Sequence, residues 1–196
     1  MRVIAGSAKG KRLKAKEGLV TRPTSARVRE AIFDILAPYL EGSSFLDLYA
    51  GSGAVAIEAL SRGAGRAVLV DHDPTCRRLA ESNLRLAGLS RKAEVRCRDV
   101  GEALLAMGRK GEKFDLVFLD PPYQEELVDK TLKMILLAGV LRDGGLVLAE
   151  HGRRETVPGE VGTLQKLKHY RYGDTMLSLY RQKKEAPGNE GGTVSR

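Results

Sequence analysis

The sequence contains an acid, two prolines and a tyrosine in succession, Asp120-Pro121-Pro122-Tyr123, directly after the apolar stretch 114–119. A proline has no N–H to offer a strand ladder, so the pair must end a strand there in a stiff turn. Such a turn fixes the directions of its carbonyl groups and of the side chains beside it. Ligands bind in open α/β sheets outside the carboxyl ends of the strands. The tetrapeptide is therefore a candidate ligand site, with a purely structural strand exit as the alternative.

A second candidate site is a glycine-containing turn between a predicted strand and a predicted helix. Its residues are Asp47, Tyr49, Ala50, Gly51, Ser52 and Gly53. Glycines at such a turn let a ligand come close to the backbone, and the amides at the helix start face that ligand. The dinucleotide fingerprint G-x-G-x-x-G is incomplete, because Ala56 occupies the place of the third glycine. A tight turn without a ligand is equally compatible with these residues.

Two further acids follow the next two predicted strands. Asp71 lies 18 residues past Gly53, where an acid can accept hydrogen bonds from ribose hydroxyls, and Asp73 is a neighbouring candidate. Asp99 ends the third predicted strand and could face a purine ring. Together with the glycine turn these acids predict a nucleoside pocket, to which the adjacent residues His72 and Val100 also belong. A solvent-facing loop is the alternative for each acid.

The positive charge of the chain is concentrated at its N-terminus. The formal charge is +8, yet residues 1–30 hold nine Lys and Arg against two Asp and Glu, whereas residues 31–180 hold 20 against 21. A clustered basic segment favours a polyanion partner, with a solubility tail as the alternative. Residues 1–30 contain no aromatic residue, so phosphate contact suits this segment better than base stacking. The predicted RNA-binding residues are Arg2, Lys9, Lys11, Arg12, Arg22, Arg27 and Arg29.

Short apolar strands alternating with helices predict an α/β fold with a parallel sheet covered on both faces. We expect strands at 45–49, 67–70, 94–99, 114–119 and 146–149, and helices at 54–62, 74–87, 101–109 and about 125–137. Another helix should follow a cap at Thr24 or Ser25, and strands at 164–172 and 175–182 should form a hairpin turning at Gly173-Asp174. We divide the chain into a basic hairpin arm (1–24), one domain (25–183) and a disordered tail (184–196).

Several other classes of protein are disfavoured by composition. No apolar run approaches the roughly 18 residues of a membrane span, and the N-terminus has no signal-peptide pattern, so a cytoplasmic location is expected. Two cysteines are too few for a disulfide framework, and the three histidines stand far apart. We therefore expect no metal site.

The glycine turn, Asp71, Asp99 and the acid-proline turn together resemble class I S-adenosylmethionine-dependent methyltransferases that act on exocyclic amino groups of nucleobases. The chain resembles in particular the RsmD family. The segments that carry this resemblance are 2–13, Arg22-Pro23-Thr24, Arg27–Phe33, Ala50–Gly53, Glu58–Ala64 and Asp120–Tyr123. Asp71 is a departure, since family members commonly carry Glu there.

The resemblance implies a Rossmann-like fold with a seven-stranded, mostly parallel sheet whose last strand is antiparallel. It also implies methyl transfer to the 2-amino group of a guanine in 16S ribosomal RNA, either as rRNA or in the assembling small subunit. The Asp120 carboxylate and the Pro121 carbonyl would then accept the amine hydrogens, and Tyr123 would stack on the base. We expect a monomer.

Three alternatives stay open at this point. A DNA amino-methyltransferase would use the same type of Asp-Pro-Pro-Tyr motif, but such enzymes usually need a long target-recognition insertion that this chain lacks. A nicotinamide dehydrogenase is disfavoured by the missing third glycine. A ribosome-assembly factor without catalysis would keep the basic arm, although the intact Asp120–Tyr123 segment argues against loss of activity.

Overall fold

The computed structural model describes residues 1–15, 25–122 and 126–183. The first helix is α1 (Ala26–Leu36), and a short 3-10 helix, η1 (Ala37–Tyr39), continues it. Ser25 caps α1, because its side chain accepts a hydrogen bond from the amide of Val28 at 3.2 Å. The predicted capped helix after the Arg-Pro-Thr segment is thus confirmed, with Ser25 as the cap.

From residue 44 strands and helices alternate as predicted. The elements are β1 (Ser44–Leu48), α2 (Ala54–Ser61), β2 (Arg66–Asp71), α3 (Pro74–Ala87), η2 (Ser90–Lys92), β3 (Ala93–Cys97), α4 (Val100–Arg109), β4 (Phe114–Leu119), α5 (Leu127–Ala138), β5 (Leu141–Gly152), β6 (Glu160–Val161), β7 (Leu164–Tyr172) and β8 (Thr175–Gln182). The bounds predicted for α3, β4, β7 and β8 are confirmed. Strand β5 is longer than predicted, because its polar first half, Arg142 to Gly145, carries no apolar signal.

The described strands form one sheet in the order β3-β2-β1-β4-β5-β8-β7-β6. Strands β1 to β5 are parallel, and β8 is antiparallel to both of its neighbours, β5 and β7. The mostly parallel sheet and its antiparallel last strand are confirmed, but the sheet has eight strands rather than seven. The additional strand is β6, which has only two residues. The strand order reverses between β1 and β4, which is where such sheets bind ligands.

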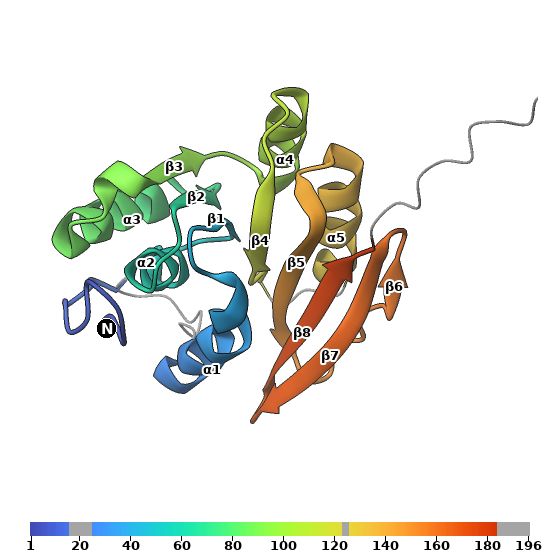
Figure 1. The fold of residues 1–196 in the computed structure, drawn as a ribbon, viewed down its shortest axis with the longest axis horizontal. Helices are drawn as coiled ribbons and strands as arrows, with labels where there is room; N and C mark the ends of the chain where they lie inside the picture. Colours follow the sequence, from blue (N-terminus) through green and yellow to red (C-terminus); the bar gives the residue numbers. More distant parts are fainter. Residues whose placement is uncertain (16–24, 123–125, 184–196) are drawn as a thin grey trace, which may run out of the picture.

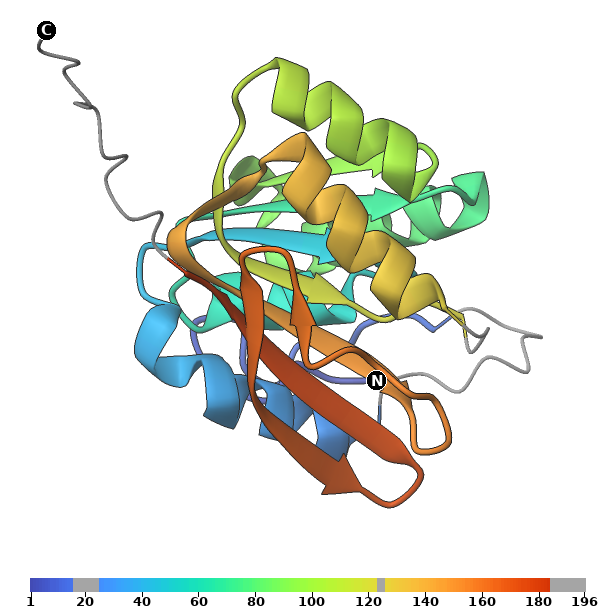
Figure 2. The same ribbon diagram turned by 90° about the vertical axis from the view of Figure 1, so that its right-hand side faces the viewer.

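Helices cover both faces of this sheet, as Figures 1 and 2 show. Helices α1, α2 and α3 pack on one face, where Phe45, Leu69 and Phe118 belong to the core. Helices α4 and α5 pack on the other face, around Leu46, Val70 and Leu119. Alternate residues of each strand therefore enter opposite layers, so every residue of β1 is buried.

Residues 1–15 pack against the domain. Arg2 and Arg12 form an antiparallel bridge, and the amide of Leu13 donates to the carbonyl of Met1 at 2.9 Å. Val3, Ala8 and Leu13 are buried in the same core layer as α1 and α2. The predicted arm boundary at residue 24, Arg22 and the predicted tail at 184–196 lie outside the described residues, so the domain division stays a prediction.

Candidate functional site

The glycine turn is held in shape by bonds to two neighbouring elements. Tyr49, Gly51 and Gly53 all have a positive φ, at 63°, 54° and 74°. The amide of Gly51 donates to Oδ2 of Asp71 at 2.8 Å, and the Tyr49 hydroxyl lies 2.8 Å from Oγ1 of Thr131 in α5. The turn is therefore fixed to the end of β2 on one side and to α5 on the other.

Gly53 also permits close packing at the start of α2. A Cβ at this position would lie 2.8 Å from Cδ2 of Leu69 and 3.2 Å from the Cβ of Ala80. A side chain there would crowd the side chains of Leu69 and Ala80, and the positive φ disfavours it further. The second glycine of the turn is thus favoured by close packing as well as by backbone conformation.

Asp47 lies beneath the turn and is 1% exposed. Its Oδ2 accepts a hydrogen bond from the amide of Ala56 at 3.0 Å, which fixes the first turn of α2. Burial raises the pKa of Asp47 to about 8, and the nearby carboxylates of Asp120 and Asp71 raise it too. Acids at or next to the carboxyl ends of β1, β2 and β4 are thus close enough to act on one another electrostatically.

Asp71 and its neighbour His72 lie at the end of β2. The two carboxylate oxygens of Asp71 accept the amides of Gly51 and Asp73, at 2.8 and 2.9 Å. Each oxygen has a second lone pair, so these bonds leave capacity for ribose hydroxyls. His72 is exposed, with its Nδ1 3.8 Å from Oδ1 of Asp71. The structure therefore joins the predicted ribose acceptor directly to the glycine turn.

Asp99 and Val100 lie at the start of α4. Asp99 caps this helix, because its Oδ1 accepts the amide of Glu102 at 3.1 Å. Burial raises the pKa of Tyr49, and the negative charge of Asp99 adds to that rise, which places Asp99 near the glycine turn. Val100 is buried, whereas Asp99 is exposed. Asp99 is thus a helix cap in addition to a candidate ligand contact.

The acid-proline turn lies beside the glycine turn. The amide of Asp120 faces the carbonyl of Leu48 at 3.5 Å, so the residue after β4 stays aligned with the end of β1. Asp120 is half-buried, Pro121 is buried and Pro122 is exposed. Tyr123 lies outside the described residues. The structure brings Asp120 and Pro121 to the same edge as the predicted nucleoside pocket.

Some residues of the site were not singled out from the sequence. Thr131 binds Tyr49, and the fully buried Asn83 of α3 holds the glycine turn from below. The Asn83 Nδ2 donates to the carbonyl of Ser52 at 2.9 Å and to that of Lys14 at 3.1 Å, while its Oδ1 accepts the Lys14 amide at 2.8 Å. The available signal was an asparagine among the buried positions of an amphipathic helix.

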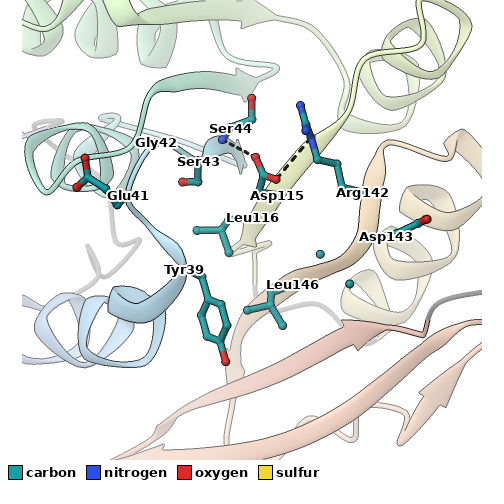
Figure 3. Close-up of a pocket in the computed structure, with 12 residues that line it drawn as sticks. Tyr39, Glu41, Gly42, Ser43, Ser44, Asp115, Leu116, Arg142, Asp143 and Leu146 are labelled. Carbon is teal, nitrogen blue, oxygen red and sulfur yellow. Dashed lines mark hydrogen bonds and ion pairs between the residues drawn. The ribbon is translucent and has the colours of Figure 1, made fainter.

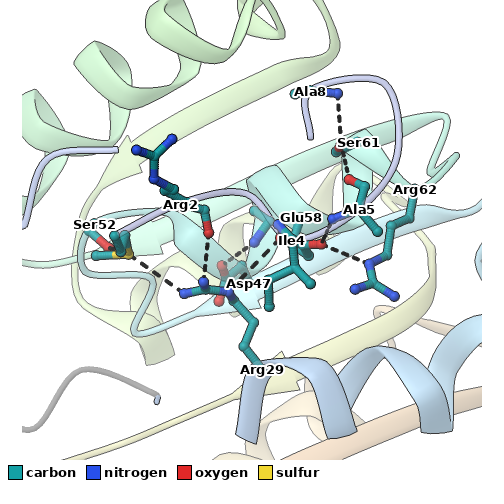
Figure 4. Close-up of polar contacts among 12 residues, drawn as sticks. Arg2, Ile4, Ala5, Ala8, Arg29, Asp47, Ser52, Glu58, Ser61 and Arg62 are labelled. Atoms are coloured by element: carbon teal, nitrogen blue, oxygen red, sulfur yellow. Dashed lines mark hydrogen bonds and ion pairs between the residues drawn. The ribbon is translucent and has the colours of Figure 1, made fainter. Parts of the chain in front are cut away.

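A buried acid, Glu58 of α2, holds the N-terminal segment against the domain (Figure 4). Its carboxylate accepts the amides of Ile4 and Ala5 at 2.8 and 2.9 Å and the Nε of Arg62 at 2.8 Å. Ser61 adds a second attachment, because its hydroxyl accepts the amide of Ala8 at 2.9 Å. The basic arm is therefore hydrogen-bonded to the Glu58–Ala64 segment, which carries part of the family resemblance.

The prediction that Arg29 contacts RNA at the surface is wrong. Arg29 is 3% exposed, its Nη2 donates to the carbonyl of Arg2 at 2.8 Å, and its Nε lies 3.9 Å from Glu58. Burial lowers the pKa of this guanidinium, and Glu58 opposes that shift. Arg29 therefore joins α1, α2 and the arm, as Figure 4 shows.

The other described residues that we predict to bind RNA are accessible. These are Arg2, Lys9, Lys11, Arg12 and Arg27. Of this group, Arg2 also donates from Nη1 to the carbonyl of Gly10 at 3.1 Å, which stiffens the arm. The exposed cations thus lie on a folded segment whose apolar side chains face the core.

A cavity of about 450 Å³ lies at the opposite edge of the sheet, around the amino ends of β1, β4 and β5 (Figure 3). Asp115 accepts the amide of Ser44 there at 2.8 Å and lies 3.5 Å from the Nε of Arg142. None of the predicted site residues lines this cavity. Among the residues that the structure describes, no group of three or more His, Cys, Asp or Glu is placed to hold a metal ion.

The helices of the described ranges are all too short or too polar to span a lipid bilayer.

The sheet order, the antiparallel β8 beside β5 and the site at the reversal of strand order are those of the class I methyltransferase fold. The chain belongs to the family described as conserved hypothetical protein 95, whose model matches residues 1–181.

Two relatives and one solved structure support this membership. "Putative rRNA methyltransferase YlbH" of Bacillus subtilis is 40% identical over 183 residues, which are 93% of this chain and all of that protein. "Ribosomal RNA small subunit methyltransferase D" of Escherichia coli is 33% identical over 150 residues, 76% of this chain and 74% of that protein. The structure of "Putative methyltransferase yhhF" from Escherichia coli has a TM-score of 0.83 at 31% identity and covers 94% of this chain and 99% of its own. The resemblance to the RsmD family is thus confirmed.

Proposed function

We propose that this protein methylates small-subunit ribosomal RNA with S-adenosylmethionine as the methyl donor, and that the acceptor is the 2-amino group of a guanine. The observation that carries the proposal is the position of Asp120-Pro121 beside the glycine turn, at the reversal of strand order. Family membership and the names of the relatives support rRNA as the substrate. The choice of guanine follows from the sequence resemblance.

The residues at this edge suit S-adenosylmethionine. The backbone at Gly51 and Gly53 is free of side chains, and Asp71 stands where a ribose would be held. The cofactor carries a sulfonium and an ammonium cation, and the carboxylates of Asp71 and Asp120, which both add to the rise in the pKa of Asp47, favour positive charge nearby. When bound, the cofactor supplies an electrophilic methyl group.

The chain's own residues then have to align and stabilise a weakly nucleophilic amine. The Asp120 carboxylate and the Pro121 carbonyl accept the two amine hydrogens, which turns the nitrogen lone pair toward the methyl group. The same two oxygens stabilise the positive charge that develops on the nitrogen. The methylated amine is strongly acidic and loses its proton to Asp120 or to water. Stacking of the base on Tyr123 would complete the alignment, after the base has left any stack in the RNA.

The decisive experiment is transfer of tritiated methyl groups to naked 16S rRNA and to small subunits from a strain that lacks the enzyme, followed by mapping of the modified base. We expect incorporation at N2 of one guanine. Incorporation into duplex DNA instead would favour the amino-methyltransferase acting on DNA. Absence of transfer to both RNA substrates would contradict the proposal.

Asp120→Ala tests the role of the acid. We expect calorimetric binding of S-adenosylmethionine to persist while methyl transfer is lost. The matched control is Asp143→Ala, an exposed acid at the opposite edge of the sheet, which should leave transfer unchanged. Full turnover by Asp120→Ala would remove Asp120 from the mechanism.

A further inference from the structure

Three arginines gather at the free end of the β7–β8 hairpin, at the same sheet edge as the candidate site. Strand β8 is antiparallel to β5, with Thr175 opposite Gly152, so the hairpin turns beside the carboxyl end of β5. Arg171 lies at the end of β7, and Arg153 and Arg154 directly follow β5. All three side chains are exposed. We call these three residues the hairpin tip.

Backbone bonds hold the hairpin tip together. The amide of Arg153 donates to the carbonyl of Asp174 at 2.9 Å, which joins the segment after β5 to the hairpin turn. The Nε of Arg171 donates to the carbonyl of Gly173 at 3.2 Å. The backbone that carries the three arginines is therefore held together by hydrogen bonds, while their side chains are exposed to solvent. Arginine is among the residues whose contacts with phosphates set the orientation of a protein on a nucleic acid.

The local charge of this surface contrasts with that of the rest of the domain. The tip and the exposed Lys168 of β7 supply four positive charges, against the acids Glu155 and Asp174 in the same loops. Residues 31–180 as a whole hold 20 Lys and Arg against 21 Asp and Glu. The tip is thus a positive surface on an otherwise slightly negative domain, which favours a polyanion at this place.

The tip lies at a distance from Asp120 that suits flanking phosphates. Ala149 of β5 is opposite Leu119 of β4, and β5 continues three residues further, or about 10 Å. Strand β7 is three positions from β4 in the sheet, or about 14 Å. Arg171 of β7 is therefore too far away to touch the reacting base, whereas Arg153 and Arg154 follow β5, the neighbour of β4. All three side chains can reach phosphates beside the base.

The basic arm and the hairpin tip lie on different sides of the candidate site. The arm is fixed to α2 through Glu58 and Ser61, whereas the tip lies outside β5 (Figure 1). We propose that the hairpin tip is a second RNA-binding surface, which holds phosphates of the small-subunit rRNA on the β5 side of the target base, apart from those that the arm would hold. This inference rests on the proposed function, because it takes rRNA as the substrate.

The test is the salt dependence of binding of the full chain to naked 16S rRNA, measured by filter binding with no methyl donor present. The variant carries Arg153→Ala, Arg154→Ala and Arg171→Ala. A plot of log K against log salt concentration has a negative slope, and each lost phosphate contact should make this slope less steep by about 0.7–0.9. We expect a total decrease of roughly 2 and weaker binding, while calorimetric binding of S-adenosylmethionine is unchanged.

A matched control removes the same charge elsewhere. Arg85, Arg109 and Lys110 are exposed and lie at the ends of α3 and α4, toward the opposite edge of the sheet. Their replacement by Ala should leave the wild-type slope. Arg171→Lys keeps the charge but not the Nε bond, so it should also keep the slope if charge rather than turn geometry is responsible.

Two results would overturn the inference. The first is a wild-type slope in the triple tip variant, and the second is an equal loss of slope in the matched control, which would assign the effect to net charge alone. These results can be told apart from a failure of the proposed function. In that case the wild-type protein itself would transfer no methyl group to rRNA or to small subunits.

Discussion

Glu58 offers the sharpest test of how the basic arm is attached. Glu58→Ala removes a carboxylate that is 1% exposed and that accepts three hydrogen bonds, from the amides of Ile4 and Ala5 and from Arg62. The substitution also removes the acid that faces the buried Arg29. The variant is thus left with two amides and a guanidinium without their acceptor.

The size of the expected loss follows from these contacts. Hydrogen bonds to a charged group contribute about 1.5–3 kcal/mol each, and they are not additive when they share one acceptor. Breaking a buried ion pair by removing one partner typically destabilises by about 3–5 kcal/mol. We expect Glu58→Ala to lower the free energy of unfolding by about 3–5 kcal/mol.

Urea unfolding followed by far-UV circular dichroism measures this loss, and hydrogen exchange at the amides of Ile4 and Ala5 localises it. The matched control is Glu81→Ala, which also removes an acid bonded to an arginine four residues away on a helix. Arg77 is exposed and Glu81 is only half-buried, so the loss of this pair should leave the urea midpoint unchanged within error.

The reasoning is refuted if Glu58→Ala unfolds at the wild-type urea concentration and the amides of Ile4 and Ala5 keep their protection. Local detachment of the arm would instead give fast exchange at these two amides with a small change in the global midpoint. That outcome would place the contribution of Glu58 in the arm alone rather than in the whole domain.

Three further predictions concern the site and the arm. Asp47→Asn should remove a pH dependence: with its pKa raised to about 8, Asp47 stabilises the fold below the unfolded pKa and loses this contribution as the pH rises toward 8. The stability of the wild type relative to Asp47→Asn should therefore fall between pH 4 and 8, by at most about 1.4 kcal/mol per unit, and a constant difference in urea unfolding would contradict this. Asn83→Leu removes the hydrogen bonds to Ser52 and Lys14, so it should lower the free energy of unfolding by about 1–3 kcal/mol and weaken the binding of S-adenosylmethionine measured by calorimetry. Unchanged binding would contradict the idea that Asn83 couples the arm to the glycine turn. Joint replacement of Lys9, Lys11 and Arg12 by Ala should weaken rRNA binding and flatten its salt dependence, and a wild-type slope would count against the arm as an RNA surface.

The sequence predicted those parts of the fold that rest on local signals. The prolines after Leu119, the Gly173-Asp174 turn and the apolar periodicity of 74–87 each define an element without reference to distant residues, and these bounds are confirmed. The two-residue strand β6 was missed, because a pair of residues has no periodicity to detect.

The burial of charged residues could not be predicted in the same way. Arg29 lies in a basic segment, so its composition favoured the surface, but Glu58 lies 29 positions further along the chain and only the fold brings the two together. The same holds for Asn83, whose partner Lys14 is 69 positions away. Local patterns identify a charge, whereas a long-range partner decides whether it can be buried.

These buried polar residues also connect the N-terminal arm to the candidate site. Asn83 bonds both the arm at Lys14 and the glycine turn at Ser52, and Glu58 bonds the arm from the helix that begins at the same turn. The surface proposed to bind RNA and the turn proposed to bind the cofactor therefore share one support. Because a protein interior is closely packed, movement of the arm would have to disturb this support, so the two sites are mechanically joined. The arm is thus part of the site's architecture rather than a basic tail attached to a finished domain.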